Sequence, residues 1–291
     1  MGKKILAMSL ALVMALAFVA CDGDGLPTAQ EIVDGTSQAM ADVRTCKFDM
    51  EMAMDMDGEA EGESIDANIE MDASGALDIE NNQLKMTMNM EVTGEEDIDV
   101  EAEMYLVDNT FYILTDMLGM GPTWMKLEMS EMEELPEEYW EEADLLELPT
   151  ELLEAFEVKV TGSERVGGVD CYVLESTPDM EQLWQMFETT ELEMTDIPED
   201  FEHYFDEMFD SFSMKEWIAK DTYFPMKVEI EISMEFAPEA MGFPEEEGEA
   251  NIDITMTMLI YDYNQPVSIE LPPEAEGAIE IPMDYMDFMD Y

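Results

Sequence analysis

Basic residues, histidine and cysteine are scarce in this 291-residue chain, and the shortages exclude several classes of function. There are 11 Lys and Arg against 73 Asp and Glu, so nucleic acid, whose binding requires basic side chains, is excluded as a partner. The single histidine, His203, would leave a histidine-dependent triad or metal site resting on one residue. Glycine-rich phosphate-binding signatures are also absent. We therefore expect no enzyme, no metal site and no cofactor.

Long apolar runs are scarce too, and the one that is present lies at the N-terminus. Lys3 and Lys4 precede an uncharged run at 5–20, which is short for a membrane span and has the length of a signal-peptide core. Cys21 follows directly, and a segment rich in Gly and Asp comes after it. One interpretation of this segment is an ordinary secretory signal cut near Ala20. The other depends on the residues around Cys21.

The junction FVAC at 18–21 resembles the lipobox of bacterial lipoproteins, although Phe18 stands where that motif usually has Leu. The resemblance implies a signal peptide at 1–20 and a tether at 21–27. Acyl chains such as palmitate on Cys21 would hold the protein at the outer face of the cell membrane. In a cell with two membranes, Asp22 directly after the cysteine implies the inner one.

A period of two organises most of the remaining chain. At 48–57 Phe and Met at even positions alternate with Ala and acidic residues at odd positions. This period places the two rows on opposite faces of a β-strand, whereas a helix would mix them. The pattern returns at 84–92, 98–106, 224–236 and 252–260. We expect a mainly β protein with α (α+β), built on one large antiparallel sheet with a Met-rich face and an acidic, solvated face.

Capping and turn signals divide the chain into elements. Thr28 and Glu31 form a capping box and predict a helix up to about Val43. Further helices are expected after Ser130, Pro149, Asp179 and Pro198. The last of these carries an aromatic stripe of Phe201, Tyr204, Phe205, Met208, Phe209 and Phe212. Strands are expected near 46–57, 63–73, 75–80, 83–93, 97–107, 111–115, 124–127, 156–165, 169–176, 212–221, 224–236, 249–262 and 267–271. Residues 28–273 then form a single domain, followed by an acidic flexible tail at 274–291.

Acidity and methionine content set this domain apart. Without Lys3 and Lys4 the chain keeps 9 basic and 73 acidic residues, a net charge of −64, which suits a cation-rich exterior and predicts weak, diffuse cation binding. Its 28 methionines outside the signal fit core filling, a deformable wall for a ligand, or Cu(I) binding by M-x-M rows. Cys46 and Cys171, an even pair in an exported protein, suggest a disulfide, with two buried thiols as the alternative.

Four stretches in chain order resemble LolA-like lipoprotein carriers and the LppX/LprG lipoproteins. They are MYLVDNTFY (104–112) with WMKL (124–127), GSERVGGVDCYVL (162–174), WIAKDTYFPMK (217–227) and YDYNQPVSI (261–269). The resemblance covers most of residues 40–273. It implies a curved, open half-barrel of about 11 strands, with helices packed in or over the concave face and a cavity that carries lipids or acyl chains.

The resemblance also implies a function. The chain would be a membrane-anchored extracytoplasmic lipoprotein that binds a lipid or other apolar ligand, as a carrier or a sensor. Candidate wall residues of the cavity are Met52, Met54, Met88, Met104 and Met256. The alternative is a non-catalytic structural or interaction lipoprotein of the cell envelope, with an acidic, cation-rich surface and no ligand cavity.

Overall fold

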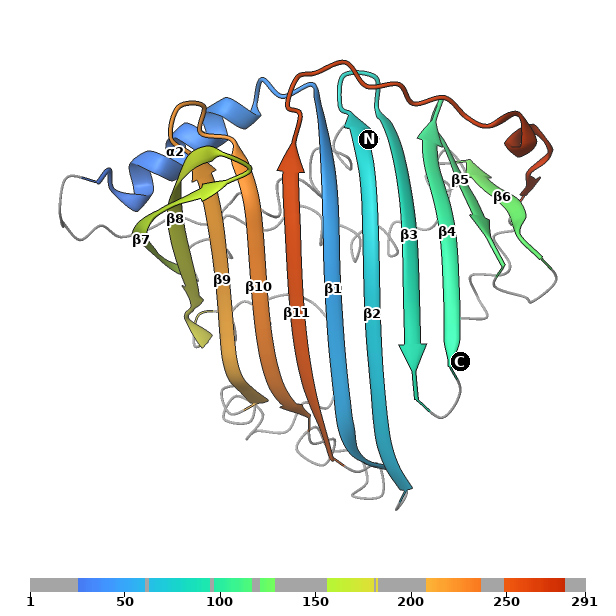
Figure 1. Cartoon of the computed structure of the whole chain (residues 1–291), viewed down its shortest axis with the longest axis horizontal. Helices are drawn as coiled ribbons and strands as arrows, with labels where there is room; N and C mark the ends of the chain where they lie inside the picture. Colours follow the sequence, from blue (N-terminus) through green and yellow to red (C-terminus); the bar gives the residue numbers. More distant parts are fainter. Residues whose placement is uncertain are drawn as a thin grey trace.

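A computed structural model describes residues 26–60, 63–94, 97–116, 121–128, 156–180, 182, 208–236 and 249–280. In these ranges the chain forms one open sheet of 12 strands with a single complete α-helix, α2 (Ala29–Met40), beside it (Figure 1). The prediction of a mainly β protein built on one large sheet is confirmed. The helices expected after Ser130 and Pro149 lie outside the described residues, as does most of the helix after Pro198. Of the helix expected after Asp179, Met180 and Gln182 are described as helical, and the Gln182 backbone N–H donates to Asp179 Oδ1 at 3.2 Å.

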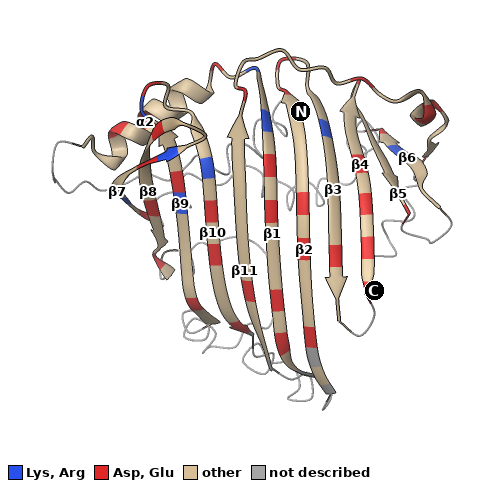
Figure 2. Ribbon diagram, viewed as in Figure 1, with Lys and Arg blue, Asp and Glu red and all other residues tan. Residues whose placement is uncertain are grey.

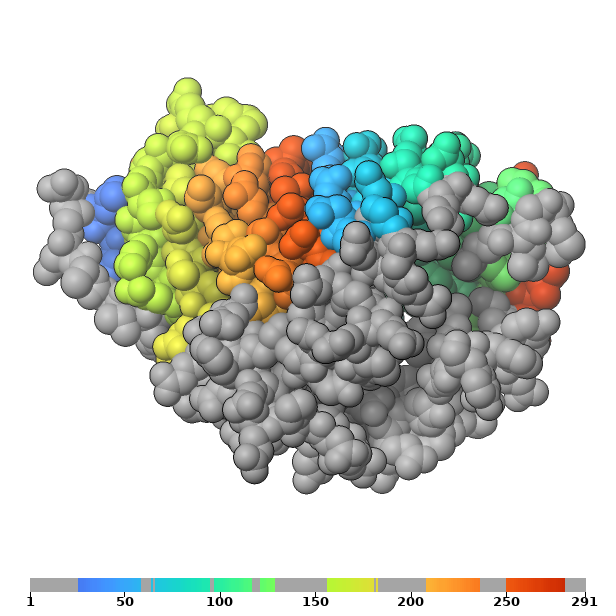
Figure 3. Space-filling model, turned by 90° about the horizontal axis from the view of Figure 1, so that it is seen from below, coloured from blue at the N-terminus to red at the C-terminus, as the bar shows by residue number. Residues whose placement is uncertain are grey.

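The sheet consists of two meanders joined side by side. The first contains β1 (Thr45–Ala60), β2 (Glu63–Asp78), β3 (Gln83–Thr93), β4 (Ile98–Val107), β5 (Thr110–Thr115) and β6 (Thr123–Glu128). The second contains β7 (Phe156–Val166), β8 (Val169–Pro178), β9 (Phe209–Ala219), β10 (Pro225–Phe236) and β11 (Glu249–Tyr261). Antiparallel pairing of β1 with β11 joins them, so the first and last long strands lie at the centre. Figure 3 shows the described strands as one continuous band.

Cross-strand register places the alternating residues on two separate faces. Phe48 lies opposite Ile260 on β11 and opposite Gly75 on β2, and the even-numbered residues of β1 follow on the same side. We call this side the inner face, because α2 packs on it, and the opposite side the outer face. A Cβ at Gly75 would lie 2.6 Å from Cζ of Phe48, so only glycine fits beneath that ring.

The buried core lies where α2 meets the inner face. Thr28 accepts a hydrogen bond from the Glu31 backbone N–H while the Glu31 carboxylate accepts one from Thr28, which confirms the predicted capping box. Ile32 of α2 is fully buried. It belongs to a cluster drawn from both meanders, which contains Cys46, Phe48, Leu77, Leu106, Val158, Leu174, Met214, Ile218, Val228 and Ile260. We call this region the helix end of the inner face.

Short turns connect the strands as the sequence predicted. Asp108 and Asn109 both have positive φ, at 51° and 61°, which is the backbone of a type I′ hairpin turn between β4 and β5. Gly167 and Gly168, at 58° and 88°, make the equivalent turn between β7 and β8. Gly75, in contrast, does not interrupt its strand, because β2 runs from residue 63 to 78 as one element.

The chain after β11 differs from the prediction. Residues 267–271, expected as a strand, are not paired in the sheet, because β11 already lies between β1 and β10 and offers them no free edge. The segment instead crosses the ends of the central strands (Figure 1). It then forms a short 3₁₀ helix, η4 (Pro273–Gly277), and β12 (Ile279–Glu280), which pairs in parallel with β6. Residues 274–280 therefore belong to the fold and not to a flexible tail.

The aromatic stripe expected on a helix is also partly wrong. Phe209 and Phe212 belong to β9, opposite Met234 and Ile232 of β10. A register shift between Ser233 and Met234 places both aromatic residues on the inner face although they are three positions apart. A bulge in a strand thus reproduces the spacing of an amphipathic helix.

Candidate functional site

The five predicted wall residues all lie on the inner face. Met52 and Met256 are directly opposite each other on β1 and β11, and Met54 is the next inner residue of β1. Met88 of β3 shares a cross-strand row with Ala73 and Ala102, and Met104 of β4 lies opposite Met86. The structure therefore brings Met52, Met54 and Met256 together. Met88 and Met104 extend the same apolar surface over the first meander, because neighbouring strands are about 4.8 Å apart.

Burial changes along the inner face. Phe48 and Ile260, at the helix end, are 9% and 1% exposed. Further along β1 and β11 the inner side chains are only half-buried. We call this part the methionine end; it comprises Met52, Met54 and Met56 of β1 and Ile252, Ile254 and Met256 of β11. Flexible, polarizable Met side chains adapt to irregular apolar partners.

Sequence reasoning missed a carboxyl group on the inner face. Glu216 of β9 is 4% exposed, and its cross-strand neighbours are Leu174 and Val228. Burial raises the pKa of its carboxyl to about 8. The even-numbered pattern of Phe212, Met214, Glu216 and Ile218 was the available signal. Trp217 and Ala219 on the other side of β9 are buried as well, so alternation alone did not show which side faces the core.

The outer face carries the acidity. Figure 2 shows Asp and Glu along most strands, with several of the few basic residues near the upper strand ends. Asp55 lies opposite Asp253, and Glu91 lies between Glu70 and Asp99, arrangements of like charge that salt must screen. Within the described ranges, no group of three or more His, Cys, Asp or Glu side chains is placed to hold a metal ion. His203 lies outside these ranges.

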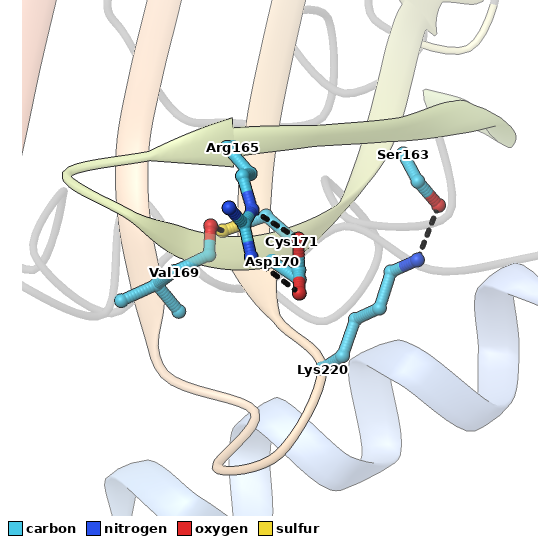
Figure 4. Close-up of polar contacts among 6 residues, drawn as sticks. All are labelled: Ser163, Arg165, Val169, Asp170, Cys171 and Lys220. Carbon is cyan, nitrogen blue, oxygen red and sulfur yellow. Dashed lines mark hydrogen bonds and ion pairs between the residues drawn. The ribbon is translucent and has the colours of Figure 1, made fainter.

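Four of the basic side chains in the described ranges form ion pairs with nearby acids. Lys47 binds Asp262 at 2.7 Å between Nζ and Oδ2, which raises the lysine pKa. Arg165 donates to both oxygens of Asp170, at 2.6 and 3.3 Å, and holds the pKa of that carboxyl below its usual range (Figure 4). These exposed pairs contribute little stability.

Residues in the stretches that resemble LolA-like carriers and the LppX/LprG lipoproteins contact one another. The indole N–H of Trp217 donates to Glu164 at 2.9 Å. Lys220, directly after β9, donates to Ser163 at 2.6 Å (Figure 4), so the end of β9 is held to the β7–β8 hairpin. The hydroxyl of Tyr263 donates to the Pro225 carbonyl at 2.6 Å, and its ring stacks on Phe224. These contacts stabilise the fold.

The predicted disulfide is wrong. Cys46 and Cys171 are both free and fully buried. Cys46 lies on β1 and Cys171 on β8, with β9, β10 and β11 between them, a separation of about 19 Å at about 4.8 Å per strand. A disulfide requires Cα atoms within about 7 Å. Burial raises the pKa of the Cys46 thiol to about 12 and also raises the pKa of Cys171, so both are inert thiols.

The profile of a family described as "Family of unknown function (DUF6612)" matches residues 28–279. No curated protein sequence matches the chain. None of the helices within the described ranges is long and apolar enough to cross a membrane.

Several solved structures are similar to this chain at low sequence identity. Lipoprotein LppX of Mycobacterium tuberculosis has a TM-score of 0.36 at 10% identity, over 82% of this chain and 97% of that one. LprF of Mycobacterium bovis has a TM-score of 0.38 at 13% identity, over 84% and 96%. A LolA superfamily protein of Nitrosomonas europaea has a TM-score of 0.21 at 11% identity, over 85% and 96%.

Proposed function

We propose that this chain, which belongs to the family of unknown function DUF6612, is an extracytoplasmic lipoprotein that binds a lipid or another apolar ligand on the inner face of its sheet. The proposal rests on the difference in side-chain burial between the two ends of that face. The helix end contains the cluster of buried side chains, and the methionine end presents half-buried Met and Ile side chains on a continuous sheet surface. Adaptable Met side chains suit a ligand of variable shape.

Binding is tested by two adjacent substitutions on β11 that point to opposite faces. Met256→Asp places a charge on the methionine end, and Thr255→Asp places the same charge on the outer face. Protein isolated from membranes under mild conditions is analysed by native mass spectrometry and organic extraction. We expect lipid with the wild type and Thr255→Asp, and at least tenfold less with Met256→Asp, because a carboxylate in an apolar site costs more than 1.4 kcal/mol.

Folding of both variants is checked by circular dichroism. Wild-type protein without lipid would reject the proposal. It would favour the structural or interaction lipoprotein, whose inner face is covered by protein alone and whose acidic outer face meets a cationic partner or weakly bound cations.

The membrane anchor is a separate part of the proposal. The apolar run before Cys21 and the FVAC junction support lipidation of that cysteine after removal of residues 1–20. Mass spectrometry of the mature N-terminus is expected to show acylated Cys21, with the protein at the outer face of the cell membrane. An unmodified Cys21, or retention of Lys3, would contradict the anchor. In a cell with two membranes, Asp22 supports the inner one, which fractionation tests.

A further inference from the structure

Four polar side chains, among them Thr115 of β5, are buried on the inner side of the sheet without a hydrogen-bond partner among the residues that the structure describes. Glu216 of β9, Ser176 of β8 and Thr36 of α2 are 4%, 0% and 3% exposed. Ser176 Oγ and Thr36 Oγ1 have no hydrogen-bond partner, and no hydrogen bond or ion pair joins the Glu216 carboxyl group to the residues that the structure describes. Native proteins pair nearly all such groups, so each requires an explanation.

Two of these groups are neighbours in the sheet. Leu174 lies opposite Glu216, and Ser176 lies opposite Met214, in the β8–β9 register. Ser176 and Glu216 are therefore diagonal neighbours on the inner face, with their Cα atoms about 7–8 Å apart. Their side chains point to the same side of the sheet.

Both groups present a hydrogen-bond donor in apolar surroundings. The Ser176 hydroxyl donates, and the Glu216 carboxyl, with its pKa raised to about 8 by burial, is protonated at neutral pH and donates as well. Leu174 and Val228 beside Glu216 are 1% and 0% exposed. Two donors without nearby charge match a single neutral acceptor, of which a carbonyl oxygen is the simplest.

We propose that Ser176 and Glu216 bind the carbonyl oxygen of an uncharged acyl ester whose hydrocarbon chain lies along the inner face. The inference rests on the proposed function and deepens it, because it names the polar group that the apolar ligand carries. A pure hydrocarbon would leave both donors unpaired, and binding the ester would satisfy them.

The test uses the full-length protein and two pyrene probes of equal chain length, a pyrenedecanoic acid methyl ester and an alkylpyrene. We expect the wild type to bind the ester about tenfold or more tightly, the effect of one or two hydrogen bonds. The preference should fall several-fold in Ser176→Ala and vanish in Ser176→Ala/Glu216→Leu. Glu216→Gln, which keeps an amide donor, should retain it. Ser213→Ala, on the outer face of β9, is the matched control.

A second measurement reports the hydrogen bond directly. The infrared band of a ¹³C-labelled ester carbonyl should move to lower frequency on binding to the wild type and to Ser213→Ala, but not on binding to the double variant. If both probes bind and the ester preference is absent or survives in the double variant, this inference is overturned and the proposed function stands. If neither probe binds, both fail. If the double variant does not fold, Ser176→Ala decides, since it removes a hydroxyl that bonds nothing in the protein.

Discussion

Glu216→Gln is expected to make the protein markedly more stable at pH 8.5 while leaving its stability at pH 4 nearly unchanged. Burial among Leu174 and Val228 raises the pKa of the Glu216 carboxyl from 4.5 to about 8. Between these values the folded chain keeps a proton that the unfolded chain has lost. Stability therefore falls as the pH rises through this window, by roughly 4–5 kcal/mol in total. Glutamine cannot ionise, so the variant avoids this loss.

The measurement is urea unfolding of wild type and variant from pH 4 to pH 8.5, in enough salt to screen the acidic surface. Glu231→Gln, which removes an exposed carboxylate from the outer face of β10, serves as the control for net charge. The difference between Glu216→Gln and wild type should grow from near zero at pH 4 to several kcal/mol at pH 8.5. If the free energies of unfolding of wild type and Glu216→Gln instead differ by the same amount at every pH, Glu216 is already ionised or hydrated in the folded state.

The same carboxyl shows where sequence reasoning stopped. A period of two located the strands well, and the bounds of β3 at 83–93 were predicted to the residue, because one buried face and one solvated face leave a clear pattern. In β9 both faces are covered near Trp217, so the pattern is lost. Glu216 would ordinarily be assigned to solvent, and only the register with β8 and β10 places it inside.

The other errors come from non-local pairing. The separation of Cys46 and Cys171 depends on the order of the two meanders, which no spacing in the sequence records. Residues 267–271 alternate like a strand but have no free edge beside them, and β12 pairs with a strand about 150 residues earlier. The position of Phe209 depends on a bulge in its pairing with β10. Local signals such as the Thr28 capping box and the Asp108–Asn109 turn were predicted correctly, because their physics involves only neighbouring residues.

The candidate wall residues were found by the same alternation, which identified their shared face but not their environment. Met52, Met54 and Met256 lie together at the methionine end, whereas Met104 is 9% exposed and belongs to the buried part of the sheet. This difference in burial along one face is what separates a wall suited to a ligand from an ordinary core. Its effect on stability can be measured on β1, because that strand contributes side chains to both the helix end and the methionine end.

Phe48→Ala is expected to destabilise the protein by about 3–5 kcal/mol, the usual cost of removing a buried aromatic side chain. Phe48 packs between Ile260 and Gly75, and the space above Gly75 has no side chain of its own to collapse into the cavity. Met56→Ala, on the same strand and face, is the matched comparison. Met56 is half-buried at the methionine end, between Ile252 and Ala67, so we expect a loss of roughly 1 kcal/mol.

Urea unfolding of protein freed of lipid measures the loss in free energy of unfolding for Phe48→Ala and for Met56→Ala. The measurement is then repeated with added lipid extracted from the wild type, which tests whether either substitution affects binding. A ligand that binds only the folded state raises stability according to its concentration and affinity. Met56→Ala should lose part of that added stability if the ligand contacts the methionine end, whereas Phe48→Ala should keep it, because its cavity lies in the packed helix end. Equal destabilisation by the two substitutions without lipid would mean that the inner face is one uniform core, and the division on which the binding proposal depends would be rejected.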